Sequence, residues 1–297
     1  MPPAEVEIDE ELVRRLLAAQ HPDLADRPLA LLASGWDNVL YRLGDDLLVR
    51  LPRRQAAVDL IRAEQRWLPM LAPRLPLPIP VPVRIGTPDG DYPWPWSVGR
   101  YLPGASALAV ILDGGHIDHA SVAATLGRFC AALHTPADDD APHNPFRGIP
   151  LADRDAMTRQ RIDQVESLID TAAALELWER SLATPAWAGA ALWLHGDLHP
   201  GNLVVDDGRI TAVIDFGDIT SGDPATDLAV AWMLFPPEHR PTFRTAAGPA
   251  AADDDTWARA RGWALALGLA ILASSADNPA YHQLATRTLA AVFGDPR

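Results

Sequence analysis

The chain has 297 residues, enough for one large or two modest domains, and 48% of them are hydrophobic, enough for a substantial core. Its formal net charge of −14 argues against a nucleic-acid partner, because binding a phosphate backbone needs a basic surface. An acidic protein attracts cations instead, although the same charge also serves solubility.

Neither a membrane protein nor a disulfide-stabilised one is predicted. The sequence has no apolar run of about eighteen residues, the length that a transmembrane helix needs, and its acidic N-terminus does not resemble a signal peptide. The single cysteine, Cys130, lies in an apolar helical pattern and is expected to be a small core residue. We expect a cytoplasmic monomer without a membrane partner.

The first part of the chain predicts a helix followed by antiparallel strands. Asp9 is a suitable N-cap, and the apolar positions after it repeat with helical spacing. Residues 29–44 predict a strand, a turn and a second strand, and Leu47 to Leu51 a third strand that Pro52 ends. Three consecutive antiparallel strands make a small twisted sheet.

Further elements complete this sheet. Val58 to Leu68 has the spacing of an amphipathic helix, and Pro69 is expected to stop it. A proline-rich segment then leads to a fourth strand, Val83 to Thr87, and Asp89-Gly90 turns the chain into a fifth, Tyr92 to Leu102.

The rest of the chain is mostly helical. Residues 118–134 predict one helix, and residues 153–182 predict a long helix with a possible break near Thr171. Asp223-Pro224 has the composition of a helix start, and two or three helices are expected within residues 254–293.

A polar segment interrupts this helical pattern. Trp193 to Val205 and Ile210 to Ile214 contain apolar runs separated by Asp206-Asp207-Gly208-Arg209, and Asp-Gly between two such runs is a strong hairpin signal. We expect Asn202 to begin one strand and Asp215 to end its partner.

The residue types in this hairpin suit phosphoryl transfer. The Asp197 carboxylate can take the proton of a hydroxyl, while Asn202 and Asp215 offer the oxygen ligands that Mg²⁺ prefers. Asp197 lies five residues before Asn202, and an Asp-Phe-Gly follows at residue 215, which is the spacing of the protein-kinase catalytic loop. Gly196 replaces the arginine of that motif.

The motif His-Gly-Asp-x-His-x-x-Asn, residues 195–202, resembles that of the aminoglycoside phosphotransferase family, small-molecule kinases that include macrolide phosphotransferases. This resemblance implies a two-lobed, protein-kinase-like α+β fold. Residues 1–98 would form a nucleotide-binding lobe with an antiparallel sheet and helices, residues 99–102 a connector, and residues 103–297 a mainly helical lobe for catalysis and substrate binding.

The resemblance also implies a nucleotide site. ATP or GTP would be the co-substrate, with Mg²⁺ held by Asn202 and Asp215 while Asp197 acts on the acceptor hydroxyl. In a kinase-like fold the first turn covers the nucleotide phosphates, so Ser34 and Asn38 would supply hydrogen-bond donors there.

Relatives usually carry a lysine on the third strand to bind the phosphates, whereas this chain has Arg50. A guanidinium can bridge phosphate oxygens, but it is wider than an ammonium and planar. Glu64, on the following helix, would form an ion pair with Arg50 as in kinases. Arg53 and Arg54 are alternative phosphate-binding cations, although they lie beyond the proline.

The resemblance also implies an adenine-binding segment in the connector. Backbone groups of Arg100, Tyr101 and Leu102 would bind adenine.

Three further residues would support the catalytic segment structurally. His195 would hold the backbone of the loop, His199 would keep Asp197 in place, and Asp227 would brace the loop through hydrogen bonds.

The acceptor remains open at this stage. The family resemblance implies an aminoglycoside or a macrolide, and the acidic composition suits a cationic acceptor, but related kinases act on amino alcohols and sugars. One alternative is a nucleotide-binding protein without transfer activity. Others are a metallohydrolase using His195, Asp197 and His199, and a structural turn between core strands.

Overall fold

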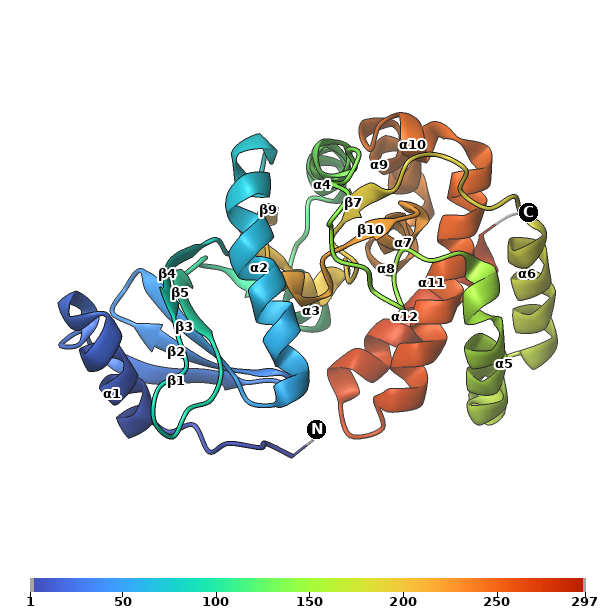
Figure 1. Cartoon of the computed structure of the whole chain (residues 1–297). Coiled ribbons are helices and arrows are strands. Elements are labelled where there is room, and N and C mark those ends of the chain that lie inside the picture. Colours follow the sequence, from blue (N-terminus) through green and yellow to red (C-terminus); the bar gives the residue numbers. More distant parts are fainter. Residues whose placement is uncertain (1–2, 296–297) are drawn as a thin grey trace. The chain divides into compact units, whose positions relative to one another are not determined.

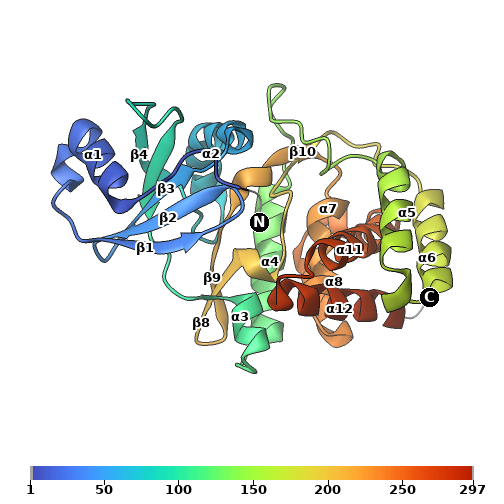
Figure 2. The ribbon, with the colours of Figure 1, turned by 90° about the horizontal axis from the view of Figure 1, so that it is seen from below.

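The computed structural model describes residues 3–295 and divides the chain into two compact units. The N-terminal unit comprises the chain to Pro73, Pro78–Pro103 and Ile214–Gly217. The C-terminal unit comprises Arg74–Leu77, Gly104–Val213 and the chain from Asp218 onward. Figures 1 and 2 show the elements of each unit in two views.

The N-terminal unit contains a five-stranded antiparallel sheet with the strand order β1-β2-β3-β5-β4. The strands are β1 Leu29–Ser34, β2 Asn38–Leu43, β3 Leu47–Pro52, β4 Pro82–Gly86 and β5 Trp96–Arg100. Arg50 of β3 pairs with Leu40 on one side and with Ser97 on the other. The third strand is therefore central, and its side chains are fixed from both sides.

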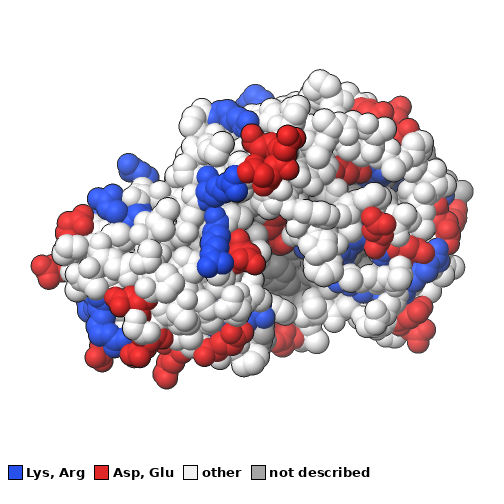
Figure 3. All heavy atoms as spheres, viewed as in Figure 1, with Lys and Arg blue, Asp and Glu red and all other residues white. Residues whose placement is uncertain are grey.

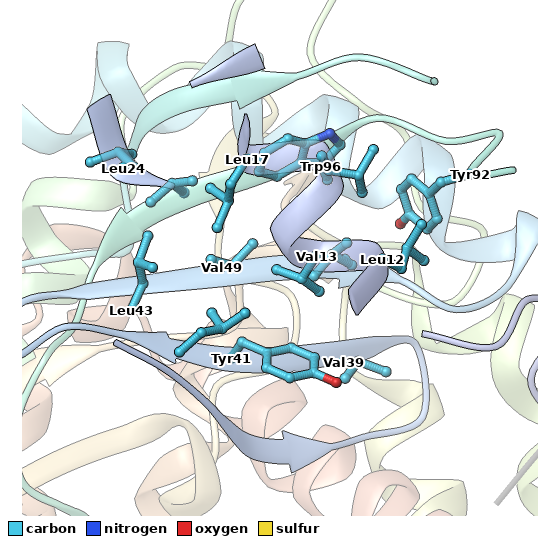
Figure 4. Close-up of a cluster of buried hydrophobic side chains, with 14 of the residues drawn as sticks. Leu12, Val13, Leu17, Leu24, Val39, Tyr41, Leu43, Val49, Tyr92 and Trp96 are labelled. Atoms are coloured by element: carbon cyan, nitrogen blue, oxygen red, sulfur yellow. The ribbon is translucent and has the colours of Figure 1, made fainter. Parts of the chain in front are cut away.

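Helix α1, Glu10–Gln20, covers one face of this sheet, and Figure 4 shows Val13 and Leu17 of the helix beside Val49 of β3. The helix begins as expected, because the Asp9 side chain accepts a hydrogen bond of 2.8 Å from the Leu12 backbone N–H. Its apolar side chains are buried in one core with residues of β1, β2, β3 and β5.

Helix α2 runs over Val58–Leu71, so the expectation that Pro69 ends it is wrong. Pro69 removes only one backbone donor of the last turns. Continuing the helix buries Leu71, which is 2% exposed, on the same side as Leu68. Burial of a leucine of this kind is worth roughly 1.5–3 kcal/mol, which offsets the missing hydrogen bond.

The C-terminal unit is mainly helical, and α11, Asp254–Ser274, is its central helix, packing against α5, α6, α7 and α12. The helices are α3 Ala107–Leu112, α4 His119–Leu133, α5 Asp155–Gln164, α6 Thr171–Ala183, α7 Ala225–Leu228, α8 Val230–Leu234, α9 Arg240–Ala246, α10 Pro249–Ala252, α11 and α12 Pro279–Gly294. Across both units, single 3-10 turns occur at η1 Pro22–Leu24, η2 Gln55–Ala57, η3 Ala72–Arg74, η4 Leu151–Arg154, η5 Glu166–Leu168, η6 Pro200–Asn202, η7 Phe216–Asp218 and η8 Pro237–His239.

The helical prediction for residues 153–182 is correct only with its break. The chain forms α5 and α6 as separate helices, and the Asp170 side chain caps α6 by accepting a hydrogen bond from the Ala173 N–H. Helix α4 extends between its two caps as predicted, and Cys130 on it is fully buried.

The catalytic hairpin is present, with small shifts of its ends. Strands β8, Leu203–Asp206, and β9, Arg209–Val213, are joined by Asp207 and Gly208, both with positive φ, as a tight hairpin turn requires. Asn202 lies in the short helical turn just before β8, and Asp215 lies two residues beyond β9. Strand β6, Ala105–Ser106, extends this sheet, while β7, Leu192–Leu194, pairs with β10, Thr220–Gly222.

The structure confirms the predicted α+β class with an antiparallel sheet in the first part of the chain. Among residues 3–295, no helix combines the length and hydropathy needed to cross a bilayer. On the face drawn in Figure 3, acidic side chains stand in small groups among arginines and uncharged residues.

Candidate active site

The loop after β7 carries the candidate catalytic residues of the C-terminal unit. Gly196 makes this loop possible, because its φ is +87° and a Cβ there would lie 2.1 Å from the Asp218 carbonyl oxygen. The arginine found at this place in protein kinases would not fit this backbone. The replacement is therefore dictated by local geometry.

Asp227 braces this loop through hydrogen bonds to its backbone. Its carboxylate is fully buried and accepts hydrogen bonds from the backbone N–H groups of His195, at 2.8 Å, and Gly196, at 2.9 Å. The ring of His134 lies 3.1 Å away through Nε2. Burial acts to raise the pKa of Asp227, but these partners outweigh it and lower the pKa, so the carboxylate is ionised.

Asp197 lies in the middle of a hydrogen-bonded loop. Gly201 N–H donates to His199 Nδ1 at 2.9 Å, so a neutral His199 carries its proton on Nε2, which faces Asp197 Oδ2 at 3.4 Å. The Asp197 N–H in turn donates to His195 Nδ1 at 3.2 Å. Burial acts to raise the pKa of Asp197, but His199, Arg147 and His195 lower it well below its ordinary value.

Asn202 is oriented by Asp197. Its amide nitrogen donates to the Asp197 backbone carbonyl at 2.8 Å, and no residue of the described chain donates to its side-chain oxygen. That oxygen is thus left for another partner, and a carboxamide oxygen is a suitable ligand for Mg²⁺. The residue therefore fits the role of a metal ligand.

In the N-terminal unit, Arg50 brings the other candidate residues together. Its Nη1 donates to Glu64 Oε1 at 2.8 Å, and its Nη2 donates to Asp215 Oδ1 at 3.1 Å. The amide of Asn38 faces the same guanidinium, with its oxygen 3.2 Å from Nε and 3.0 Å from Nη2 in the orientation that satisfies both groups. Asp215 has a positive φ of +62°, unusual for a residue with a Cβ, and its side chain is 55% exposed.

Burial affects the pKa values of Glu64 and Arg50 differently. Burial raises the pKa of Glu64 to about 7, and the attraction of Arg50 only partly opposes this. Burial also acts to lower the pKa of Arg50, but Glu64 and Asp215 outweigh it and raise the pKa. Arg50 is therefore permanently charged, whereas Glu64 titrates near neutrality.

Two further arginines secure the turn between β1 and β2. Arg53 Nη1 donates to the Gly35 carbonyl at 2.9 Å and faces the Ser34 hydroxyl at 3.4 Å, while Arg54 is paired with Asp37. Both alternative cations are thus occupied in the turn. Arg50 is the arginine that points at Glu64 and Asp215.

Only some of the connector residues have backbone groups free to bind adenine. The Tyr101 backbone N–H donates to the Asp46 carbonyl at 2.8 Å, and its ring lies under the Arg42 guanidinium. Arg100 is the exposed last residue of β5, paired with Leu47. Of the three predicted residues, Leu102 follows the strand without a ladder partner in the described chain.

The described residues do not form the metal site that the metallohydrolase alternative requires. Within residues 3–295, no three His, Cys, Asp or Glu side chains are grouped so that they could hold a metal ion. His195 Nδ1 accepts from the Asp197 backbone N–H at 3.2 Å. The three residues instead serve the loop's own hydrogen bonds.

Sequence reasoning missed His134 and Arg147. Arg147 Nη2 lies 3.2 Å from Asp197 Oδ1, although the two residues are fifty positions apart. The loop that carries Arg147 is fixed at the next residue, because the Gly148 N–H donates to Thr226 Oγ1 and the Gly148 carbonyl accepts from the Asp223 N–H. No local sequence motif predicts the contacts of His134 or Arg147.

The antiparallel sheet, the helical second unit and the Asp-x4-Asn loop are features of kinase-like phosphotransferases. A family model described as "Phosphotransferase enzyme family" matches residues 28–263, and the chain belongs to this family.

Solved structures of similar fold come from antibiotic phosphotransferases. The GDP complex of aminoglycoside 2'-phosphotransferase-IIIa superimposes with a TM-score of 0.69 at 20% identity, covering 96% of this chain and 97% of that one. The apoenzyme of macrolide 2'-phosphotransferase MphH from Brachybacterium faecium has a TM-score of 0.62 at 26% identity, covering 97% and 99%.

A curated relative matches over a shorter stretch. The uncharacterized protein YcbJ of Bacillus subtilis is 29% identical over 114 residues, which is 37% of this chain and 37% of that protein. The match therefore spans little more than a third of the relative's length.

Proposed function

We propose that the protein transfers the γ-phosphoryl group of ATP or GTP to a hydroxyl of a small molecule. The observation that carries this proposal is the braced loop in which Asp197 and Asn202 are hydrogen-bonded to each other. In the reaction, the acceptor oxygen forms a bond to the γ-phosphorus, the bond from that phosphorus to the β,γ-bridging oxygen breaks, and the nucleoside diphosphate leaves.

Asp197 would accept a hydrogen bond from the acceptor hydroxyl and finally take its proton. Its lowered pKa makes it a weak base, so the proton would move late, when the hydroxyl oxygen is already bonding to phosphorus. The main contribution of the residue is then orientation of the hydroxyl. His199 and Asn202 would keep the carboxylate in that orientation through contacts with its Oδ2 at 3.4 and 3.5 Å.

Mg²⁺ bound by Asn202 and Asp215 would neutralise phosphate charge. Arg50 would contact the phosphates from β3, with Glu64 holding it in place. Ser34 and Asn38 would complete the phosphate contacts. The base would meet the backbone of Leu102 more readily than that of Tyr101, whose N–H is already bonded.

The first candidate acceptors are aminoglycosides and macrolides, because the solved structures of similar fold are named for them. Amino alcohols and sugars are the second candidates. A cytoplasmic location is supported by the single buried cysteine, which needs no oxidising compartment. A monomer remains a prediction for sedimentation analysis.

A transfer assay with labelled ATP and GTP over a panel of these acceptors tests the proposal. Asp197→Ala should reduce kcat on the best acceptor by about 10² to 10⁴ while nucleotide binding persists. Asp206→Ala, at the exposed end of β8, is the matched control and should keep full activity. Near-normal kcat for Asp197→Ala would contradict the assigned role, and binding without any transfer would favour a nucleotide-binding protein.

A further inference from the structure

Three arginines of the C-terminal unit lie close enough to influence one another and form what we call the arginine cluster: Arg147, Arg154 and Arg161. Arg147 contacts Asp197 directly. Within the described chain, Arg154 and Arg161 form no ion pair with any carboxylate. The cluster thus holds three positive charges against a single carboxylate, that of Asp197.

Two of these guanidinium groups are adjacent. Arg154 Nη1 donates to the Phe146 backbone carbonyl at 2.9 Å, and Arg147 Nη1 donates to the same oxygen at 3.3 Å. A neutral carbonyl shared by two cations compensates little of their mutual repulsion. Arg154 is only 2% exposed, so water does not screen it well.

The third arginine is aligned with Arg154 by helical periodicity. Arg154, Thr158 and Arg161 are spaced i, i+4 and i+7 along η4 and α5, which places them on one face. Arg154 also lies over Trp263 of α11, 5.2 Å from the ring centroid.

Several polar atoms in and beside the arginine cluster have no hydrogen-bond partner in the described chain. Each of the following atoms is buried without a hydrogen-bond partner in the described chain: Arg147 Nε, Arg154 Nε, Arg161 Nη1, Thr158 Oγ1 and Trp263 Nε1. An unsatisfied buried donor typically costs about 1–3 kcal/mol, and more when it is charged. Burial together with Arg147 and Arg161 lowers the pKa of Arg154 to about 10, which reflects the same lack of a counter-charge.

Other buried arginines of this chain are treated differently. Arg259, 3% exposed, donates to both carboxylate oxygens of Asp223, at 2.7 and 3.3 Å. Arg240, 4% exposed, pairs with Asp295 at 2.7 Å. The protein thus supplies a carboxylate for buried guanidinium groups elsewhere, and the arginine cluster is an exception near the proposed catalytic residue.

We propose that the arginine cluster binds an anionic group, a carboxylate or a phosphate, of the acceptor whose hydroxyl is presented to Asp197. This inference rests on the proposed phosphotransferase function. Arg147 would link the two parts of the site, because one end of its guanidinium reaches Asp197 and the other faces the cluster. Guanidinium groups bind both anions through paired hydrogen bonds.

The acceptor is then a hydroxylated acid or a phosphorylated alcohol. Its anion would accept hydrogen bonds from the partly exposed guanidinium groups of Arg147 and Arg161 and would compensate the positive charge of the buried Arg154. A polycationic acceptor would be repelled at this place, so this inference ranks anionic acceptors ahead of the aminoglycosides that the similar structures suggest. The acidic composition of the whole chain gave no indication of this local reversal of charge.

Paired acceptors in which a carboxylate replaces one hydroxymethyl group test the proposal: glycerol with glycerate, and glucose with glucuronate. The anionic member of each pair should have a kcat/KM at least about tenfold higher, since hydrogen bonds to charged groups contribute about 1.5–3 kcal/mol. Arg161→Gln, a half-buried position that does not contact Asp197, should remove most of this preference.

Arg159→Gln is the matched control. Arg159 lies on the same helix but pairs with Asp155 and Glu179, so its loss should leave the preference intact. A binding measurement runs beside the assay: inorganic sulfate should raise the melting temperature of the wild-type protein and of Arg159→Gln, and raise it much less for Arg161→Gln.

The outcomes separate the two proposals. Equal kcat/KM within each pair, or equal behaviour of both variants, overturns the anion site and leaves the phosphotransferase standing. A loss in Arg161→Gln that affects neutral and anionic acceptors alike, with a raised nucleotide KM, assigns the anion to the nucleotide and also overturns the proposal. If no acceptor reacts, the proposed function fails, and the sulfate effect alone decides whether the cluster binds anions.

Discussion

Arg50 donates to Asp215 Oδ1 across 3.1 Å with the guanidinium nitrogen that does not contact Glu64. One side chain therefore holds two carboxylates, one from a helix and one from the Asp-Phe-Gly segment. A lysine ammonium is a point charge and lacks the fork that makes this geometry possible. The sequence contains no lysine at all, so all 25 basic side chains are arginines.

Arg50→Lys should weaken nucleotide binding. The shorter, unforked cation can hold Glu64 or Asp215, and we expect the nucleotide Kd to rise by roughly tenfold, the loss of one charge-assisted hydrogen bond. Calorimetric titration with ATP and GTP measures this change. Arg62→Lys, on the exposed side of α2, is the control and should bind normally. A variant that binds as well as the wild type would mean that the fork has no role.

Glu64 should make stability depend on pH in a direction unusual for a carboxylate. Its pKa is raised from 4.5 to about 7, so the folded state holds this proton more tightly than the unfolded chain does. The free energy of unfolding should therefore fall as the pH rises through about 7, by about 3 kcal/mol at most.

Urea unfolding at pH 5, 6, 7 and 8 tests this for the wild type and for Glu64→Gln, which cannot ionise. The free energy of unfolding of the wild type, taken relative to that of Glu64→Gln, should decrease as the pH rises. The same proton removes the charge that holds Arg50, so the wild-type nucleotide Kd should increase below pH 7. Parallel pH profiles for both proteins would count against a titrating Glu64.

Asp227→Asn should destabilise the fold as well as reduce activity. The substitution removes the charge that accepts from His195 N–H and Gly196 N–H, and leaves buried donors poorly matched. We expect a loss of about 2–4 kcal/mol in the free energy of unfolding, measured by urea titration. Asp206→Asn, an exposed carboxylate on the hairpin, should change stability by less than about 0.5 kcal/mol.

Gly196→Ala separates two costs at the catalytic loop. The new Cβ meets both a positive φ and the Asp218 carbonyl at 2.1 Å. Gly114→Ala, at φ +69° with no atom within 4 Å, carries only the backbone cost, about 1 kcal/mol. Gly196→Ala should therefore lose clearly more stability than Gly114→Ala and most of the activity. Equal losses would show that the loop can move away from the carbonyl.

Much of the fold was predictable because local signals agreed with tertiary packing. The Asp9 cap, the β-strands around Arg50 and the Asp207-Gly208 turn all appear where the sequence indicates them. The end of α2 was mispredicted because burial of Leu71 outweighs the local effect of Pro69. Propensity rules do not include that contact.

The site was predictable where its residues share one short motif. Asp197 and Asn202 lie on one loop, and their mutual hydrogen bond follows from that spacing. Arg147 and His134 come from distant segments, so their contacts with Asp197 and Asp227 depend on the whole helical packing. Only the i, i+4, i+7 recurrence of Arg154, Thr158 and Arg161 could have signalled the cluster, because polar residues on a packed helical face are unusual.

The presence of Arg50 at the proposed phosphate site changes how this protein can be labelled. Covalent nucleotide probes of the acyl-phosphate type rely on a nucleophilic amine beside the phosphates, and a guanidinium whose pKa is raised by Glu64 and Asp215 stays protonated and offers none. In a mixture with lysine-bearing kinases, this protein would bind such a probe reversibly and escape acylation at its side chains. Its nucleotide occupancy has to be followed by equilibrium methods, and its absence from a list of acylated kinases would carry no information about its activity.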